Sequence, residues 1–486
     1  MGATCAVIVS GLLYTLAFVW PTYCFWAVIP VLVLLLWVAE QGDMGFWRGW
    51  LWGLLVWGVH SAFVFWSFAP LIGAWWAIGL GWFAMVIYLS LHAGLCGLAL
   101  GLVRRLVPGV LGRFTCYIVI MTLYFWWMAS AVFWPFDYFE GYLLFDLLAP
   151  WGAVTSPFLR APFVWVSWLG LNGARLLLIT YAAFWAGAIS SFKRASQPLV
   201  PSEIEGWRVN FGLERAKLIS KIGIGLLLLT SALLAPGFIC RDNIPGWSSS
   251  IGAVHAGFER MRQVDESAHT ANLSSAIARL IAANPAVTVV ITPESAFPFC
   301  CLDYHQSCAR LRKASAGRLL LLGSNRCAGE ALCNTSFAFY ANGDLTWYDK
   351  IHRMFYAERV PSFLTYLGLH DTLVSWIGYE FTAGTCCHPV FSVPKPAGTA
   401  VLPSLRPCLC SELFFTDCLA HDPNQSLPVA AQVNDAWYPG TPIPELLWAV
   451  ARLKACAYGR VIIYVSYTHA NIMLPHGELQ ELHSCT

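Results

Sequence analysis

Hydrophobic residues are distributed unevenly along this 486-residue chain, and that unevenness constrains the fold more than any other feature. From Met1 to about Ile239 the sequence is a series of long apolar blocks. From Cys240 onward, charged residues, turns and amphipathic runs return. Charged residues make up only 12% of the chain, against about 25% in soluble domains. We therefore expect a membrane domain at residues 1–239 and a soluble domain at residues 240–486.

The apolar blocks are long enough to cross a bilayer, which requires about 20 predominantly apolar residues per helix. Seven segments meet this requirement, near residues 4–20, 22–39, 48–68, 75–103, 112–134, 161–188 and 218–239. The first differs from a signal peptide, because no Lys or Arg precedes it and a second apolar segment follows at once. The sequence therefore predicts about seven membrane helices.

Lys and Arg residues gather on one side of this predicted bundle. Cytoplasmic loops are enriched in these residues, and the bias sets the orientation of the helices. The loops after the second, fourth and sixth segments contain ten of them: Arg48, Arg104, Arg105, Arg113, Lys193, Arg194, Arg208, Arg215, Lys217 and Lys221. The loops after the first and third segments contain none, and the loop after the fifth contains only Arg160. This predicts a cytoplasmic N-terminus and a soluble domain on the opposite side, which in a bacterium is the periplasmic face of the inner membrane.

The sixth apolar segment contains two polar residues, Asn172 and Arg175. A charge inside a membrane segment is costly and usually has a partner or a function. Two interpretations of Arg175 stay open: structural pairing within the bundle, and contact with a phospholipid headgroup.

The second half alternates helical and strand patterns, which predicts an α/β layered domain. Residues Asn342-Gly343 lie between two strand-like runs and are a strong hairpin signal. The expected helices are Ser267–Ala283 and Pro444–Tyr458, and the expected strands are Val287–Thr292, Leu319–Leu322, Ser336–Tyr340, Leu345–Tyr348 and Val461–Tyr467. The sequence lacks the phosphate-loop, dinucleotide-binding, serine-hydrolase and zincin motifs, so those activities have no support.

Three segments of this half contain residues suited to catalysis. Glu294 directly follows the Val287–Thr292 strand, where partial desolvation raises the pKa of a carboxyl and makes it a plausible base. Lys350 follows the hairpin. Cys410 lies at the expected start of a helix, where peptide dipoles stabilise a thiolate. Taken singly, each has an ordinary structural interpretation: a solvated loop carboxylate, a surface lysine and a buried thiol.

Together, the order Glu, Lys, Cys resembles the catalytic triad of the carbon–nitrogen hydrolase (nitrilase) superfamily. Within it, four segments are similar to motifs of the apolipoprotein N-acyltransferase family: TPESAFP, YDKIHRMFYAE, CLCSELFF and NDAW. Membrane spans before the hydrolase domain are also that family's architecture. The resemblance covers nearly the whole chain. It implies a multi-span α-helical membrane domain followed by an α/β nitrilase-type αββα sandwich domain.

The resemblance also implies a chemistry. Cys410 is the expected nucleophile, Glu294 its base and Lys350 the group that stabilises the oxyanion, while Glu358 and Glu412 are expected to position Lys350 and Glu294. The implied acyl donor is a membrane phospholipid, and the acceptor is the N-terminal diacylglyceryl-cysteine of a lipoprotein. No cofactor is implied. A metal site at Cys408-x-Cys410 would lack a second pair of ligands, and a net charge of +2 argues against a nucleic-acid partner.

Several positions depart from the family pattern. Residues 353–357 lack the usual Pro and Gly, Ser411 stands where Tyr is common, and the strand after Arg460 lacks an Asn-Thr-Gly pattern. The chain ends at Thr486 without the family's further apolar segment, so the Met354–Tyr356 and Phe363–Leu369 stretches are expected either to contact the membrane interface or to pack as a lid. Two alternatives stay open: a membrane-tethered nitrilase-type amidase, and a truncated non-catalytic homologue.

Cysteine is concentrated in the second half, where twelve of the 17 cysteines follow residue 299. An exported domain can form disulfides, but their pairing cannot be deduced from sequence. If Cys410 stays reduced, eleven cysteines remain after residue 299, so at least one other is unpaired.

Overall fold

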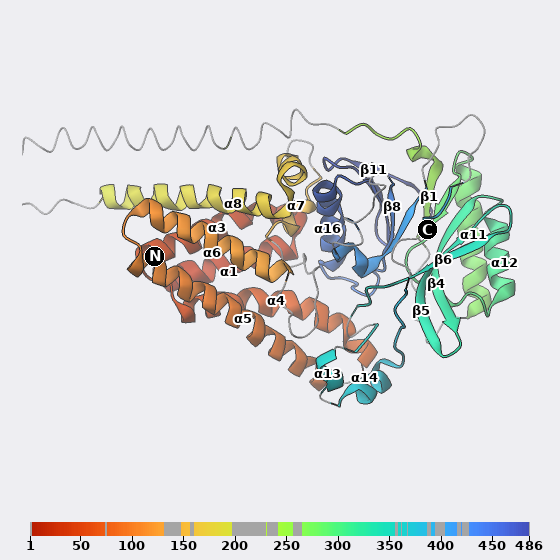
Figure 1. Cartoon of the computed structure of the whole chain (residues 1–486), viewed down its shortest axis with the longest axis horizontal. Helices are drawn as coiled ribbons and strands as arrows, with labels where there is room; N and C mark the ends of the chain where they lie inside the picture. The colour runs from red at the N-terminus through yellow and green to blue at the C-terminus, as the bar shows by residue number, and fades with distance from the viewer. Residues whose placement is uncertain are drawn as a thin grey trace, which may run out of the picture. The chain divides into compact units, whose positions relative to one another are not determined.

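The chain forms two compact units in the computed structural model (Figure 1). One comprises residues 1–65, 79–128 and 145–240, and the other comprises residues 66–78, 129–144 and 241–486. The structure describes residues 2–72, 75–130, 147–155, 160–196, 230, 242–255, 265–354, 358–360, 362–366, 368–385, 390–393, 404–415, 419 and 427–485. Phe355, Tyr356 and the side chain of Phe363, which belong to the stretches expected to contact the membrane interface or to pack as a lid, lie outside these residues.

The N-terminal half is helical, as expected. Its elements are α1 (Ala3–Val19), α2 (Pro21–Cys24), η1 (Phe25–Ala27), α3 (Val28–Gln41), α4 (Phe46–Ile72), α5 (Trp75–Leu106), α6 (Val110–Ser130), α7 (Ala149–Gly152) and α8 (Ala161–Ser196). Among the described residues, four helices are long and apolar enough to cross a membrane: Pro21–Gln41, Gly79–Leu106, Val110–Ala129 and Ala161–Ser191. The multi-span membrane domain is confirmed. The seventh predicted span lies outside the described residues except for Thr230.

A buried ion pair joins two of these helices. Glu40 near the end of α3 accepts two hydrogen bonds from Arg113 of α6, from Nε at 2.9 Å and Nη2 at 2.7 Å. At the N-terminus, Arg48 of α4 donates to Thr4 Oγ1 of α1 at 3.4 Å. These contacts bring the start of α1, the loop after α3 and the start of α6 to the same end of the bundle. That is the end where the basic loops were predicted.

Arg175 is buried in α8 and donates a hydrogen bond to Asn172 of the same helix. This contact favours the pairing interpretation of Arg175, while its contact with a lipid headgroup stays a prediction.

The C-terminal half contains two β-sheets. One has the strand order β12-β1-β2-β4-β5-β6, with β3 also paired to β4, and the other has the order β11-β10-β9-β8-β7. The strands of the first sheet are β1 (Ile251–Val254), β2 (Val289–Ile291), β3 (Phe297–Cys300), β4 (Leu319–Ala328), β5 (Ala331–Phe339), β6 (Leu345–Asp349) and β12 (His483–Cys485). Those of the second are β7 (Arg406–Leu409), β8 (Val429–Gln432), β9 (Ile462–Val465), β10 (Ala470–Met473) and β11 (Leu479–Glu481).

Helices cover the outer faces of both sheets (Figure 1). One apolar core lies between the sheets and includes Ile291, Leu409 and Ile463. A second core joins the first sheet to α11 (Glu266–Ala283) and α12 (His305–Ala314). Helix α16 (Ile443–Tyr458) packs against β9 and β10. The order helix, sheet, sheet, helix confirms the predicted αββα sandwich.

The expected elements are present with shifted ends. The hairpin turns at Gly343, whose φ of 105° suits glycine. Strand β2 is shorter than predicted and β4 is longer, whereas α11 and α16 lie within one residue of their predicted bounds. The short helices α13 (Ser362–Tyr366) and α14 (His370–Ile377) follow the lysine motif.

Candidate active site

Glu294 lies three residues after β2, at the carboxyl end of a strand that is paired on both sides with parallel neighbours. Its side chain is buried, and Oε1 accepts hydrogen bonds from Lys350 Nζ and Asn334 Nδ2, each at 2.8 Å. Burial raises the pKa of Glu294 against the opposing charge of Lys350, and the charge of Glu358 raises it further. The predicted raised pKa is therefore confirmed.

Lys350 follows β6 directly and is only 2% exposed, so the surface interpretation of this lysine is wrong. Its Nζ lies 2.8 Å from Glu294 Oε1 and 2.9 Å from Glu358 Oε2. Burial by itself would lower the pKa of Lys350, but the two carboxylates outweigh it and hold that pKa well above the ordinary value. Lys350 is therefore a permanent cation at neutral pH, suited to stabilising an anion.

Asn334 and Glu358 hold the lysine in place. Asn334 lies on β5 opposite Lys350, whose N–H bonds the Asn334 carbonyl at 2.8 Å. The Asn334 amide donates to Glu294 at 2.8 Å and to Glu358 at 2.6 Å. Glu358 also accepts from the Met354 N–H at 2.6 Å. Sequence reasoning missed Asn334, because it lies two residues before the predicted strand Ser336–Tyr340 and meets the lysine only through the register of β5 and β6.

Cys410 is the first residue of the short helix η6 (Cys410–Phe414), directly after β7. Its φ is +45°, a left-handed conformation that costs a non-glycine residue about 1–3 kcal/mol. Ser295, the neighbour of Glu294, has a φ of +56°. The segments bearing the expected nucleophile and base thus both turn sharply where their strands end. Cys408, two residues earlier, is buried within β7 and reduced.

The Cys410 thiol is protonated in the resting site. Burial raises its pKa well above the ordinary value, and the charge of Glu294 adds to the shift, against the opposing effects of Lys350 and the Asn434 N–H. The expectation that helix dipoles would stabilise a thiolate is therefore wrong, because η6 has only five residues and burial dominates. Attack by this sulfur requires a base.

Glu412 has a different position from the one expected. Instead of contacting Glu294, its carboxylate accepts from the Leu409 N–H at 2.8 Å, the Ile351 N–H at 2.7 Å and the Tyr348 hydroxyl at 2.7 Å. These bonds join the strand before the nucleophile to the segment after the hairpin. Glu412 therefore fixes Cys410 relative to the lysine segment.

Two positions that depart from the family pattern have contacts at this site. Ser411 donates to the His352 carbonyl at 2.9 Å, which adds a second link between the nucleophile and lysine segments. Tyr467, which follows β9, donates its hydroxyl to the Glu294 carbonyl at 3.3 Å. Its own N–H bonds Asp435 of the NDAW segment at 3.0 Å. No motif in the sequence pointed to Tyr467.

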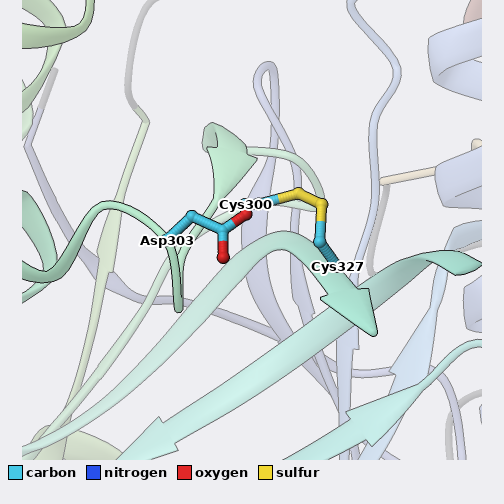
Figure 2. A group of neighbouring side chains, drawn as sticks. All are labelled: Cys300, Asp303 and Cys327. Carbon is cyan, nitrogen blue, oxygen red and sulfur yellow. A yellow bond between two sulfur atoms is a disulfide. The ribbon is translucent and has the colours of Figure 1, made fainter. Parts of the chain in front are cut away.

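Cys300, Asp303 and Cys327 come close enough together to hold a metal ion. Figure 2 shows the two cysteines joined through their sulfur atoms, with the Asp303 carboxylate beside them. A disulfide sulfur is a poor metal ligand, so one carboxylate remains and no metal is proposed here. Cys301 and Cys308 form a second disulfide. Cys333 and Cys456 are reduced, which confirms that cysteines other than Cys410 stay unpaired.

Comparison with known proteins points to one family. The apolipoprotein N-acyltransferase of Caulobacter vibrioides is 25% identical to this chain over 87% of the chain and 74% of the relative. That of Rhizobium rhizogenes is 24% identical over 39% of the chain and 36% of the relative. The chain is a homologue of apolipoprotein N-acyltransferases. No protein-family model matches it.

Similar solved structures are carbon–nitrogen hydrolases. The match to Saccharomyces cerevisiae Nit3, a nitrilase-superfamily member, covers 45% of this chain and 80% of Nit3, at 14% identity and a TM-score of 0.33. A carbon–nitrogen hydrolase from Helicobacter pylori covers 47% with 82% of its own length, at 11% identity and a TM-score of 0.33.

Proposed function

We propose that this chain is an apolipoprotein N-acyltransferase that moves an acyl chain from a phospholipid, through a Cys410 thioester, to the N-terminal diacylglyceryl-cysteine of lipoproteins. The observation that carries the proposal is the buried Glu294–Lys350–Glu358 cluster, whose charges act on the protonated Cys410 thiol. A carboxylate base and a fixed cation beside a thiol are the groups that acyl transfer needs.

In the first step, Glu294 takes the proton of the Cys410 thiol as sulfur attacks the ester carbonyl of the phospholipid. The carbon–sulfur bond forms, and the negative charge that develops on the carbonyl oxygen is stabilised by the Lys350 ammonium. The intermediate collapses as the ester carbon–oxygen bond breaks. Glu294 returns its proton to the departing alkoxide, so lysophospholipid leaves and an acyl thioester remains.

In the second step, the α-amine of the lipoprotein cysteine attacks the thioester. A carbon–nitrogen bond forms, the carbon–sulfur bond breaks, and Glu294 passes the amine proton to the departing sulfur. The amide product and the free thiol are released. Glu358 and Glu412 hold Lys350 and the nucleophile segment in place throughout.

The proposal includes an arrangement in the membrane: residues 1–239 form the membrane domain, and residues 240–486 form the catalytic domain on the periplasmic side of a bacterial inner membrane. The bias of basic residues supports this orientation. The Cys300–Cys327 and Cys301–Cys308 disulfides also support it, because disulfides persist in oxidising compartments. An impermeant thiol reagent should reach the soluble half in intact spheroplasts. Labelling only after lysis would refute the orientation.

The test of function is transfer to a synthetic diacylglyceryl-cysteine peptide. Purified protein in phospholipid vesicles should convert the peptide to its N-acylated form, and a Cys410→Ser variant should not. Hydrolysis of a carboxamide substrate, with no thioester formed from phospholipid, would favour the amidase-type alternative. The absence of both reactions in folded protein would favour a non-catalytic homologue.

A further inference from the structure

A buried glutamine connects the two β-sheets near the candidate site. Gln432 is the last residue of β8 and its side chain is fully buried. The core around it is largely apolar, with Leu409, Ala430 and Ile463 among its members. An amide in such a core is unfavourable unless its polar atoms are hydrogen-bonded. The Gln432 amide must therefore have hydrogen-bond partners within this core.

The contacts of the Gln432 amide all reach the opposite sheet. Nε2 donates to the Thr292 carbonyl at 2.8 Å and to the Leu321 carbonyl at 3.4 Å. Oε1 accepts a hydrogen bond from the Ser336 hydroxyl. The two carbonyls can only accept, so the amide nitrogen must face them. One side chain therefore bonds the end of β2 and, through Leu321 and Ser336, strands β4 and β5.

Both ends of this link lie close in sequence to the reacting groups. Across the second sheet, Gln432 is paired in register with Leu409, the residue before Cys410. In the first sheet, its partner Thr292 precedes Glu294 by two residues. Two residues after Gln432, the Asn434 backbone acts on the Cys410 thiol and opposes the rise in its pKa. The amide thus joins the backbone beside the nucleophile to the backbone beside the base.

We propose that Gln432 is a positioning residue that sets the separation between the Glu294 carboxylate and the Cys410 thiol. The base lies on one sheet and the nucleophile on the other. The apolar packing between the sheets is non-directional, so hydrogen bonds must specify their relative position. Glu412, Ser411 and Tyr467 supply such bonds in the segments that follow the strands. Gln432 supplies those that join β8 to β4, β5 and the end of β2. A displacement of about 1 Å at a reacting pair can lower a rate by about 100-fold.

The test compares Gln432→Leu with a matched control, Val429→Ala. Leucine keeps most of the buried volume but cannot bond Thr292 or Ser336. Val429 is a buried residue of the same strand, and its truncation destabilises the fold without touching this link. Ser336→Ala is a milder variant, because it removes the hydrogen bond to Gln432 Oε1 and leaves the bond from Gln432 to Thr292. It keeps the proposal testable if Gln432→Leu fails to fold.

The main readout is the pH profile of Cys410 alkylation by iodoacetamide, followed for the Cys410 peptide by mass spectrometry. This reaction needs base assistance from Glu294 but no lipid. We expect Gln432→Leu to lower the alkylation rate at neutral pH by about 10- to 100-fold and to shift the profile toward that of Glu294→Gln. Ser336→Ala should give a smaller change in the same direction. Val429→Ala should keep the wild-type profile despite its lower melting temperature.

A wild-type alkylation profile in Gln432→Leu, with only a loss of stability, would overturn the proposal. The lipid reaction, which rests on the proposed function, gives a second readout: Gln432→Leu should lower kcat for thioester formation and leave KM for phospholipid unchanged. A lower affinity for phospholipid with unchanged kcat would count against positioning. If wild-type protein shows Glu294-assisted alkylation but forms no thioester, the proposed function fails while the role of Gln432 is still decided by alkylation.

Discussion

Each half of the chain contains a buried cation paired with carboxylate, but the number of carboxylates per cation differs between the two sites. In the membrane half, Arg113 meets the single carboxylate of Glu40 through two parallel hydrogen bonds, and both side chains are buried. In the soluble half, Lys350 is shared between Glu294 and Glu358. One cation with one anion is neutral and stays in one charge state. One cation with two anions leaves a net negative charge in a desolvated site, which raises the pKa of Glu294.

This difference separates a structural contact from a reactive one. The Arg113–Glu40 pair joins α3 and α6 through two parallel hydrogen bonds. The lysine cluster acts on a protonated thiol, and one of its carboxylates has a pKa raised toward the range in which it can exchange a proton.

Removing the cation of each pair should give the largest and clearest contrast. Lys350→Ala should lower the rate of thioester formation by about 100- to 1,000-fold, the usual cost of losing an oxyanion-stabilising group. Arg113→Ala should lower the free energy of unfolding by about 3–5 kcal/mol, because Glu40 stays buried without its partner. Its folded fraction should still form thioester. The measurements are single-turnover acylation and thermal denaturation of both variants. Normal acylation by Lys350→Ala would remove lysine from the mechanism.

Removing one anion of the lysine cluster should change the pH dependence of acylation. In the wild type, thioester formation should be lost as the pH falls through the raised pKa of Glu294, because the protonated carboxyl cannot act as a base. Glu358 contributes to that raised pKa. Glu358→Gln should therefore move the acidic limb of the rate profile to lower pH, with a rate loss of about 10-fold at neutral pH from weaker orientation of Lys350. An unchanged acidic limb would show that Glu358 does not act on Glu294.

The backbone beside Glu294 offers a smaller steric test. A Cβ added at Gly323 would lie 2.1 Å from the Pro293 carbonyl oxygen and 2.8 Å from the Glu294 Cα, so the base segment must move. Gly323→Ala should cost about 1–3 kcal/mol of stability and should lower the acylation rate. The matched change in the membrane half is Gly187→Ala, where the nearest atoms, of Phe114, lie at 3.6 Å. Gly187→Ala should acylate at the wild-type rate. Equal losses of acylation in the two variants would show that the close contact at Gly323 does not position the Glu294 segment.

The smallest effect is expected at Cys408, the second thiol of the nucleophile motif. Burial raises its pKa well above the ordinary value, and it lies within β7. Cys408→Ser should retain the thioester and lose only about 1–3 kcal/mol of stability, from a hydroxyl buried in place of a thiol. Peptide mapping after acylation is the check, and acyl transfer to position 408 in the wild type would show that the nucleophile was misassigned.

Much of this organisation could be predicted from local sequence signals. The apolar blocks indicated the membrane helices, Asn342-Gly343 indicated the hairpin, and a carboxylate after a buried strand indicated the raised pKa of Glu294. Strand β3 (Phe297–Cys300) was missed, because it has only four residues and contains a proline. Its pairing with β4 depends on residues distant in sequence, which no local pattern reports.

The parts of the site that escaped prediction depend on the fold in the same way. Asn334 matters because register places it opposite Lys350, and Gln432 because its sheet faces Thr292. The helix-dipole argument for Cys410 failed because burial of the thiol is a tertiary effect that outweighs a helix of five residues. Glu412 was assigned to the wrong partner because its bonds to Leu409 and Ile351 join segments about 60 residues apart.

The most direct test of the central claim is to trap the acyl-enzyme. Wild-type protein would be incubated with phospholipid alone at neutral pH and digested, and the Cys410 peptide would be analysed by mass spectrometry before and after hydroxylamine, which cleaves thioesters. We expect a hydroxylamine-sensitive acyl group on Cys410 in the wild type and in Cys408→Ser, and none in Glu294→Gln. An acyl group on another residue, or a full thioester yield in Glu294→Gln, would contradict the proposed mechanism.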